Sequence, residues 1–317
     1  MLAPSNILEV KDLTTRFDIT DGVLSKPRAR VHAVEDISFE IGKGETLGLV
    51  GESGCGKTTT GRTILGLERV TSGDIIFNGK SVFEYNQAER IEFRRSVQMI
   101  FQDPYSSLNP RMSVFSTLSE PIRVHKLYSG NAVKERVVEL LEKVNLDAAM
   151  TKRYPHEFSG GQRQRISVAR ALALDPKLIV CDEAVSALDV TIKAEVINLL
   201  MDLQAEFGLS YLFISHDMAV VERISHRVAV MYLGRIVEIG PRSAIFEHPT
   251  HDYTKKLLGA VPVADPNLRR TERTLTHDEI PSAIKPLDFT PAKIEYEQVG
   301  DGHFVAREGL ESQRRWA

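Results

Sequence analysis

The sequence predicts an α/β protein built on a largely parallel sheet that is covered by helices on both faces. Short β-branched runs occur at 177–183 (KLIVCDE), 209–216 (LSYLFISH) and 227–240 (RVAVMYLGRIVEIG), with helical segments between them. Continuous apolar runs are typical of parallel strands that are buried on both faces. Residues 131–146 (NAVKERVVELLEKVNL) place Val and Leu at three-to-four spacing and predict a helical insert between two halves of the sheet.

The N-terminal third predicts an antiparallel β subdomain beside that sheet. Residues 7–17 (ILEVKDLTTRF) alternate like a strand, and Gly, Pro and charges make residues 20–30 a hairpin or loop. Residues 33–59 predict a strand, a glycine turn, a buried strand, a loop and a helix in succession. Residues 72–82 (SGDIIFNGKSV) predict a second hairpin, and residues 90–102 predict a helix or loop that leads into the strand VQMIFQ.

The chain divides into two unequal parts. Residues 1–260 carry the strands and helices of the main domain, including a helical subdomain at about 104–166. Residues 261–317 are rich in Pro and charge and have weak periodicity. We interpret them as a small C-terminal extension with a little strand, in AKIEYEQVG (292–300) and GHFVA (302–306).

Composition narrows the class of protein. A net charge of −3 argues against a dedicated nucleic-acid-binding protein, whose phosphate contacts usually require a basic excess. No apolar run approaches the roughly 20 residues that a membrane span needs, and the N-terminus lacks the layout of a signal peptide. We therefore expect a soluble, intracellular chain whose membrane role, if any, comes through a partner. Cys55 and Cys181 are interpreted as packing residues.

The stretch GESGCGKTTT (51–60) matches the phosphate-binding pattern G-x-x-x-x-G-K-[ST], between a predicted strand and a predicted helix. Glycines let backbone N–H groups turn toward phosphate oxygens, and the helix presents its positive N-terminal end to them. In such a loop the lysine reaches the β- and γ-phosphates and the following hydroxyl binds Mg²⁺. The candidate nucleotide-binding residues are Gly51, Glu52, Ser53, Gly54, Cys55, Gly56, Lys57, Thr58 and Thr59.

An acidic pair follows a buried strand at KLIVCDEA (177–184). Asp182, at the end of the strand, can hold Mg²⁺ through water, and Glu183 is placed to polarise an attacking water. The pair favours hydrolysis by water over transfer to a bound acceptor.

A second anion site is predicted at Ser159, Gly160, Gly161 and Gln162, where a hydroxyl and flexible amides immediately precede a helix. One nucleotide does not need two such sites from one chain. Two chains arranged head to tail would use both, with each phosphate loop facing the other chain's SGGQ.

Five motifs follow one another in the order GESGCGKT, FSGGQRQR, LIVCDE, SALD and ISHD. This series resembles that of the ATP-binding cassette (ABC) ATPases, and the resemblance covers residues 7–260. The resemblance implies a P-loop NTPase core with a mostly parallel sheet, an antiparallel β subdomain, a helical insert and a small C-terminal extension. It implies that Gln102 senses Mg²⁺ and water and that His216 contacts the γ-phosphate. It further implies a dimer-contacting D-loop at Ser186, Ala187, Leu188 and Asp189, and metal ligation by Thr58, Gln102 and Asp182.

The adenine-stacking aromatic of that family corresponds to Phe17, with His32 or Val31 as possible substitutes. Position 184 is Ala where the family usually has Pro. Because both neighbouring carboxylates are present, we expect a local backbone effect and no loss of hydrolysis.

Four segments are similar to import ATPases of the oligopeptide/dipeptide type: FQDPYSSLNPRMSV (101–114), IFEHPTHDYTKKLLGAVPVADP (245–266), EIPS and GHFVA. The second-subunit type of these importers, or a relative of the glutathione-importer type, fits best. That resemblance implies ATP and Mg²⁺ as cofactors, a second ABC ATPase subunit, two permease subunits and an extracytoplasmic substrate-binding protein. It implies a peripheral position at the cytoplasmic face of a bacterial inner membrane. Many relatives carry, between the segments that correspond to EIPS and GHFVA, a cysteine-rich segment proposed to hold an iron–sulfur cluster. This chain has no cysteine after Cys181, so no such cluster is expected.

Two other functions stay open. An ABC ATPase of DNA repair or translation would need no membrane partner, but such proteins typically insert coiled coils, zinc-binding cysteines or a second cassette. A regulatory module that binds ATP without hydrolysis is disfavoured by Glu183 and His216. Peptides are the default substrate, with nickel, opines and sugars as alternatives, and the second cassette is either a copy of this chain or a different one.

Overall fold

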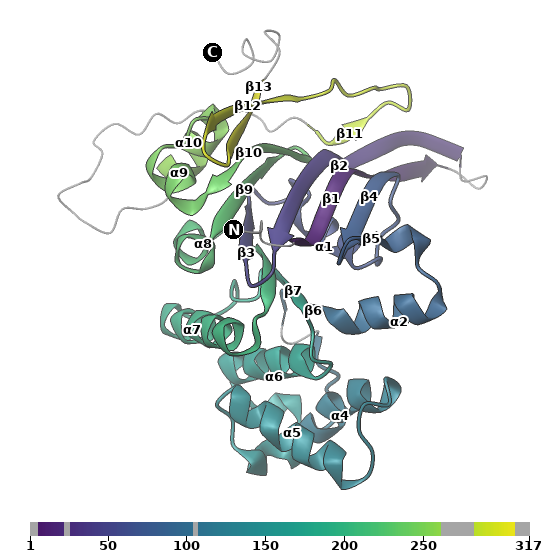
Figure 1. The fold of residues 1–317 in the computed structure, drawn as a ribbon, viewed down its shortest axis with the longest axis vertical. Coiled ribbons are helices and arrows are strands. Elements are labelled where there is room, and N and C mark those ends of the chain that lie inside the picture. The colour runs from purple at the N-terminus through teal and green to yellow at the C-terminus, as the bar shows by residue number, and fades with distance from the viewer. Residues whose placement is uncertain (1–5, 22–25, 104–106, 261–281, 308–317) are drawn as a thin grey trace, which may run out of the picture.

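The computed structural model describes residues 6–21, 26–103, 107–260 and 282–307. It has two sheets and a helical subdomain, which form the upper and lower parts of the molecule in Figure 1. Within the described ranges, none of the helices combines the length and the apolar character that crossing a membrane requires.

In the part of the chain that the structure describes, the larger sheet has eight strands in the order β12-β13-β10-β9-β3-β8-β7-β6. The five strands from β9 to β6 pair in parallel, and β10, β13 and β12 continue the sheet with antiparallel pairing. Its strands are β3 (Thr46–Val50), β6 (Val97–Ile100), β7 (Leu178–Asp182), β8 (Ser210–Ile214), β9 (Arg227–Tyr232), β10 (Arg235–Pro241), β12 (Glu295–Gly300) and β13 (His303–Arg307).

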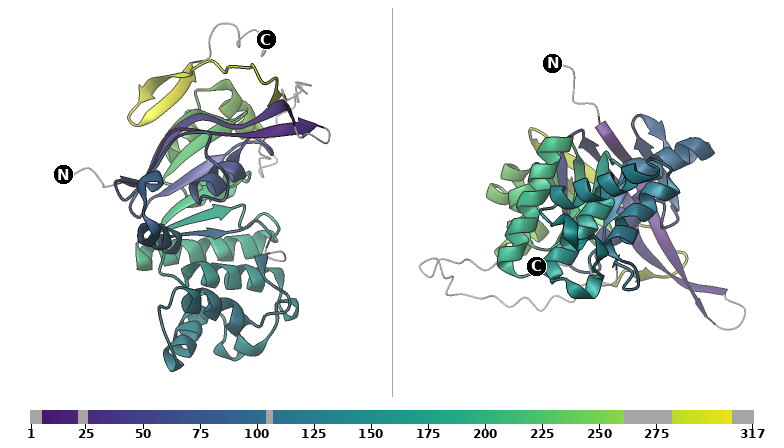
Figure 2. Two further views of the ribbon diagram at one scale, coloured as in Figure 1. Left: turned by 90° about the vertical axis from the view of Figure 1, so that its right-hand side faces the viewer. Right: turned by 90° about the horizontal axis from the view of Figure 1, so that it is seen from below.

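The smaller sheet is antiparallel, in the order β11-β2-β1-β4-β5, and its long hairpin projects from the body of the molecule (Figure 2). Its strands are β1 (Asn6–Asp21), β2 (Lys26–Gly42), β4 (Ser72–Phe77), β5 (Lys80–Ser81) and β11 (Ile284–Lys285).

Helices cover the larger sheet and build the separate subdomain below it (Figure 1). The α-helices are α1 (Lys57–Ile64), α2 (Gln87–Ser96), α4 (Val114–Val124), α5 (Asn131–Lys143), α6 (Gly160–Leu172), α7 (Val190–Phe207), α8 (Met218–Ile224), α9 (Arg242–Glu247) and α10 (Asp252–Gly259). Within the described ranges, three short 3₁₀ turns accompany them: η1 (Val82–Glu84), η2 (Ala148–Lys152) and η3 (Pro155–Glu157).

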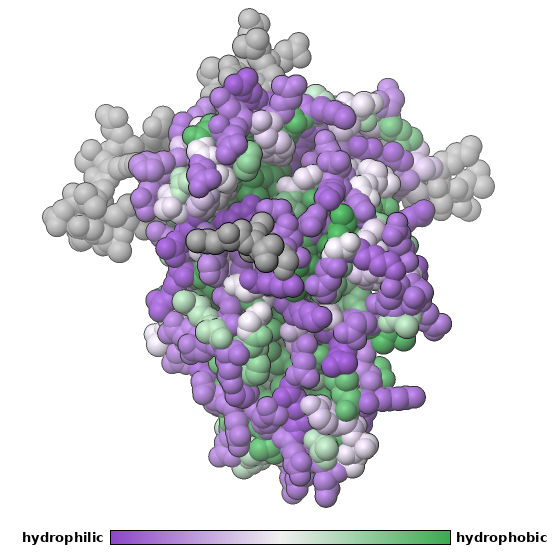
Figure 3. Space-filling view, viewed as in Figure 1, coloured by the Kyte–Doolittle hydropathy of each residue, from purple (hydrophilic) through white to green (hydrophobic). Residues whose placement is uncertain are grey.

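Alternate residues of the central strands face two different hydrophobic cores. In β8, Tyr211 and Phe213 pack into the core that contains α6, α7 and α8, whereas Leu212 and Ile214 pack into the core shared with the smaller sheet. Because side chains alternate across a strand, burial of every residue requires cover on both faces. This explains why the central strands read as unbroken apolar runs in the sequence. In the face drawn in Figure 3, hydrophobic side chains reach the surface in separate small areas among hydrophilic ones.

The predicted fold class and most predicted elements are confirmed, with two differences. Residues 227–240 form a hairpin, β9 and β10, because Leu233 and Gly234 turn the chain with positive φ. The strands of the C-terminal extension also join the sheets of the main domain. β13 pairs with β10 and β11 pairs with β2, so the extension is built onto both sheets. The division at residue 260 stays a prediction.

Gly48 gives a test of the packing between β3 and α8. A Cβ at Gly48 would lie 2.5 Å from the Ser225 Oγ and 2.8 Å from the Val221 Cγ1. Gly48→Ala should therefore lower the free energy of unfolding by about 1–3 kcal/mol, measured by urea denaturation. Gly300→Ala is the control, because a Cβ there meets nothing closer than 3.5 Å. Equal stability of the two variants would contradict the packing described.

Candidate nucleotide-binding site

The loop between β3 and α1 lies in close contact with the backbone of β9 and of β2. A Cβ at Gly51 would lie 2.1 Å from the Met231 carbonyl oxygen, and one at Gly56 would lie 2.2 Å from that of Ala33. Both glycines have positive φ, 151° and 111°. These positions therefore admit only glycine, which fixes the loop between β9 and β2 at the N-terminus of α1.

Lys57 is almost fully buried beneath the loop. Its Nζ donates to the carbonyl oxygens of Gly51 and Glu52, each at 2.8 Å, and lies 3.7 Å from the Cys55 Sγ. Burial raises the pKa of the Cys55 thiol despite the nearby ammonium group. The thiol therefore stays neutral, which agrees with the interpretation of Cys55 as a packing residue.

Thr58 and Asp182 meet at the start of α1 and the end of β7. The Thr58 Oγ1 donates to the Asp182 Oδ1 at 2.8 Å, and Asp182 is only 2% exposed. Burial raises the pKa of the Asp182 carboxyl, and the Thr58 hydrogen bond partly offsets this effect. A hydroxyl and a carboxylate at one point are the hard oxygen donors that Mg²⁺ prefers, so the residues fit this ion.

Glu183 lies between the other two predicted catalytic residues. The Gln102 Nε2 donates to the Glu183 Oε2 at 2.6 Å, and the His216 Nδ1 lies 3.1 Å from the Glu183 Oε1. Glu183 has φ 47°, a conformation that costs free energy in a residue other than glycine. Its N–H donates to the Ile214 carbonyl at 2.9 Å, which holds the turn in place.

The residues after Glu183 form a tight turn. The N–H and the Oγ of Ser186 both donate to the Glu183 carbonyl, each at 3.0 Å. Ala184 is buried, and Glu183 keeps both side-chain contacts beside it. Asp189 is the N-terminal cap residue of α7, and Ala187 and Asp189 are exposed.

The SGGQ segment forms the N-terminus of α6. The Ser159 Oγ accepts from the Gln162 N–H, and the Gln162 Oε1 accepts from the Ser159 N–H, which together form a capping box. A Cβ at Gly161 would lie 2.5 Å from the Ile192 Cγ2, so a glycine lets α6 approach α7. Figure 1 places α6 apart from α1, in the lower part of the molecule.

The structure separates two of the three candidates for adenine stacking, Phe17 and His32. His32 is 6% exposed, and its Nδ1 lies 2.6 Å from the Glu35 Oε1 while Phe289 packs against the ring edge-to-face. Burial lowers the pKa of His32. Phe17, which pairs with Val31, is 37% exposed and so retains an accessible ring. The geometry favours Phe17 over His32.

Tyr253, which the sequence did not predict as a site residue, contacts the phosphate-binding loop. The Tyr253 hydroxyl accepts from the Glu52 N–H at 3.0 Å across 201 residues of chain. The HPTHDYTKKLL segment (248–258) resembled a family pattern, but a pattern in one segment does not state which distant backbone group it contacts.

Two family models match this chain. Residues 34–186 match the family described as "ABC transporter", and residues 237–286 match "Oligopeptide/dipeptide transporter, C-terminal region". The chain belongs to the ABC transporter family. The loop before α1, the N-terminus of α6 and the end of β7 all lie within the first of these matches.

Similar proteins agree with this membership. This chain is 56% identical over 300 residues to the "Glutathione import ATP-binding protein GsiA" of Pectobacterium atrosepticum and 58% identical over 302 residues to that of Salmonella typhi. Each alignment covers 95% of this chain and 48% of the relative, so the chain spans about half the length of the curated relatives it matches.

Solved cassettes share the fold. The cbiO1 structure from Clostridium perfringens, "part of the ABC transporter complex cbiONQ", has a TM-score of 0.66 and 27% identity over 77% of this chain and 92% of that chain. The dimeric cassette MJ0796 bound to ADP and Pi has a TM-score of 0.64 and 24% identity, and covers 74% of this chain and 98% of that chain.

The raised pKa of Asp182 predicts a stability cost of the site. A carboxyl group with a raised folded-state pKa contributes stability at low pH that is lost as pH rises through that pKa. Without nucleotide and Mg²⁺, Asp182→Asn should therefore raise the midpoint of thermal unfolding, by more at about pH 7.5 than at about pH 4.5. Asp202→Asn, at an exposed position of α7, should change the midpoint little at both pH values. A lower midpoint for Asp182→Asn at the higher pH would contradict the assignment.

Proposed function

We propose that this chain binds and hydrolyses ATP and powers import through a membrane permease. The observation that carries the proposal is the position of Glu183, whose carboxylate is held by Gln102 and His216 directly after the buried Asp182. A carboxylate held at both oxygens is oriented to accept a proton from water. The relatives, which are named as import ATP-binding proteins, support the same activity.

Each residue of the site has a proposed role in hydrolysis. The loop amides and Lys57 bind the phosphates. Lys57 then gives up its hydrogen bonds to the carbonyl oxygens of Gly51 and Glu52 and binds phosphate oxygens instead. Thr58, Asp182 and Gln102 would hold Mg²⁺, which supplies positive charge to the phosphate oxygens. Glu183 orients the attacking water and accepts its proton, and His216 contacts the γ-phosphate.

We propose that the nucleotide also joins two cassettes. Ser159 to Gln162 of one chain would contact the phosphates held by the loop of the other chain, and Ser186 to Asp189 would line the contact between them. Charge-assisted hydrogen bonds contribute roughly 1.5–3 kcal/mol each, so a few of them suffice to close the dimer. Loss of the γ-phosphate contacts on hydrolysis would open it again.

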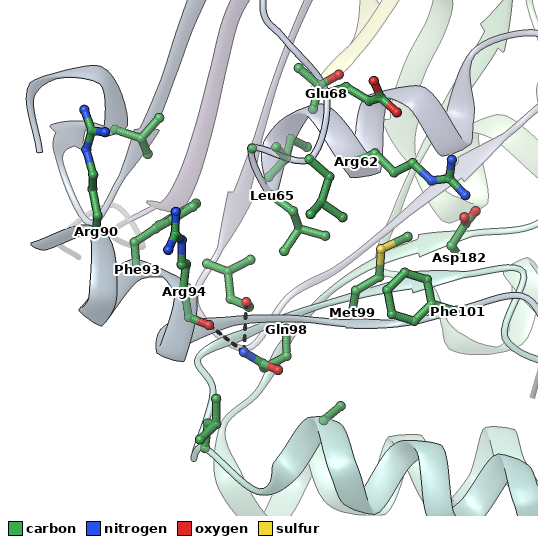
Figure 4. Close-up of a pocket in the computed structure, with 18 of the residues that line it drawn as sticks. Arg62, Leu65, Glu68, Arg90, Phe93, Arg94, Gln98, Met99, Phe101 and Asp182 are labelled. Atoms are coloured by element: carbon green, nitrogen blue, oxygen red, sulfur yellow. Dashed lines mark hydrogen bonds between the residues drawn. The ribbon is translucent and has the colours of Figure 1, made fainter. Parts of the chain in front are cut away.

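A groove beside Gln102 is the proposed contact for the permease. Its volume is ≈ 1270 Å³, and it is bounded by α1 and α2 on one side and by α4 and α6 on the other. Arg62, Arg90, Arg94 and Gln98 line it together with Met99 and Phe101 (Figure 4). Because Gln102 also lines the groove and bonds to Glu183, a helix seated there would move with the state of the nucleotide.

We propose a peptide as the transported substrate. Two findings support this: the C-terminal region resembles that of the oligopeptide/dipeptide transporters, and the relatives are named for the import of glutathione, itself a peptide. An extracytoplasmic binding protein would deliver it to two permease subunits. The chain would lie at the cytoplasmic face of the bacterial inner membrane.

Glu183→Gln tests the hydrolytic role. The amide keeps the shape of the side chain but cannot accept a proton, so the rate of ATP hydrolysis should fall by about 100-fold or more. The same variant should form an ATP-dependent dimer, detected by size-exclusion chromatography. Glu206→Gln, at an exposed position of α7, is the control and should keep the wild-type rate. A wild-type rate in Glu183→Gln would rule out the proposed base.

Purification of tagged Glu183→Gln with Mg-ATP from native membranes tests the transport role. We expect to recover a second cassette and two multi-span permeases. Recovery of ribosomes or nucleic acid without membrane proteins would overturn the import assignment and leave the ATPase assignment intact.

Phe17→Ala tests the adenine contact. Loss of base stacking should weaken ATP binding by about 1–3 kcal/mol, measured by titration with a fluorescent ATP analogue. Phe207→Ala removes a similarly exposed ring at the end of α7 and is the control. Equal affinity in both variants would exclude Phe17 as the stacking residue.

A further inference from the structure

Tyr253 is a buried residue of α10 that contacts the phosphate-binding loop directly. Its hydroxyl accepts from the Glu52 N–H at 3.0 Å, its side chain is 5% exposed, and its ring packs on Tyr232 with centroids 4.3 Å apart. Burial raises the pKa of its hydroxyl well above the ordinary value for tyrosine, so the group beside the loop stays neutral. A neutral acceptor can fix a loop amide without repelling a phosphate.

The start of α10 is fixed by the buried carboxylate of Glu238. Glu238 is 0% exposed, its Oε1 accepts from the Thr250 N–H at 2.8 Å, and its Oε2 accepts from the His251 N–H at 3.0 Å. The His251 Nδ1 in turn accepts from the Tyr253 N–H at 3.1 Å. These contacts define the backbone from residue 250 to Tyr253 and thus the place of the Tyr253 ring.

The same carboxylate also binds the C-terminal extension. The His303 Nε2 donates to the Glu238 Oε1 at 2.8 Å, and His303 is itself buried. The His303 ring packs against Gly240, where a Cβ would lie 2.9 Å from its Cδ2. β13 pairs with β10 at this point, with Val305 opposite Glu238. One carboxylate therefore holds the terminal hairpin and the turn that carries Tyr253.

We propose that Tyr253 is a positioning residue of the phosphate-binding loop and that the β12–β13 hairpin sets its position through Glu238. A loop that is already ordered loses less conformational freedom when ATP binds. The contact is with the backbone of Glu52 and not with reacting atoms, so it affects nucleotide affinity more than the rate of the chemical step. This inference rests on the proposed ATP site.

Tyr253→Phe removes the hydroxyl and keeps the buried ring. One net hydrogen bond corresponds to about a 2- to 12-fold change in affinity, so the KM and Kd for ATP should rise by that factor while kcat stays within about twofold. Tyr211→Phe is the matched control, because this buried hydroxyl donates to the Leu200 carbonyl in the core. It should leave the KM for ATP unchanged. A wild-type KM in Tyr253→Phe, or an equal rise in both variants, would overturn the proposal.

His303→Phe tests the link to the hairpin, since it keeps a ring against Gly240 and removes the donor to Glu238. Its KM for ATP should also rise, and the double variant with Tyr253→Phe should show no more than the Tyr253→Phe effect, because both act on one contact. Independent, multiplicative effects or a wild-type KM in His303→Phe would overturn the link, and this arm still decides if Tyr253→Phe fails to fold. A wild-type chain that does not bind ATP would instead contradict the proposed function.

Discussion

The parallel register of four strands is the constraint on which the site depends. β3, β8, β7 and β6 are adjacent, with Leu49 opposite Ile214, Ile214 opposite Asp182, and Cys181 opposite Ile100. Parallel strands in register end at the same edge of the sheet. The phosphate-binding loop, His216, Glu183 and Gln102 each follow one of these ends within two residues, so sheet pairing alone brings four distant segments together.

Two residues at the same edge of the sheet lower the stability of the fold. Asp182 keeps an acidic group in a buried place that favours its neutral form, and Glu183 adopts a left-handed backbone conformation. Neither feature would improve a core that served only stability. Hydrogen bonds from Thr58 to Asp182 and from the Glu183 N–H to Ile214 offset part of this cost and hold both carboxylates in place. Preorganisation of this kind means that nucleotide binding need not arrange the carboxylates.

Local patterns in the sequence predicted the elements and the residues at the ends of strands. The GESGCGKT pattern predicts the loop directly, because phosphate binding needs glycines, a lysine and a hydroxyl at fixed spacing. Local patterns could not predict the contacts between segments that are distant in the sequence. The Tyr253 contact with Glu52 depends on how α10 packs against Tyr232 of β9, and the burial of His32 depends on Phe289 from the extension. Whether a histidine is accessible is a property of its neighbours in space, which periodicity does not report.

The C-terminal extension joins the two sheets that flank the nucleotide-binding loop. β11 adds to the smaller sheet with Ile284 opposite Val31, while β13 adds to the larger sheet beside β10. Val31 also pairs with Phe17, so the strand that β11 covers is the neighbour of the proposed adenine contact. The loop itself is wedged between these sheets, against Ala33 of β2 and Met231 of β9. A segment that pairs with both walls limits their relative movement, and a limit on the walls is a limit on the loop. The extension therefore belongs to the physical description of the nucleotide site, although it supplies none of the predicted phosphate contacts.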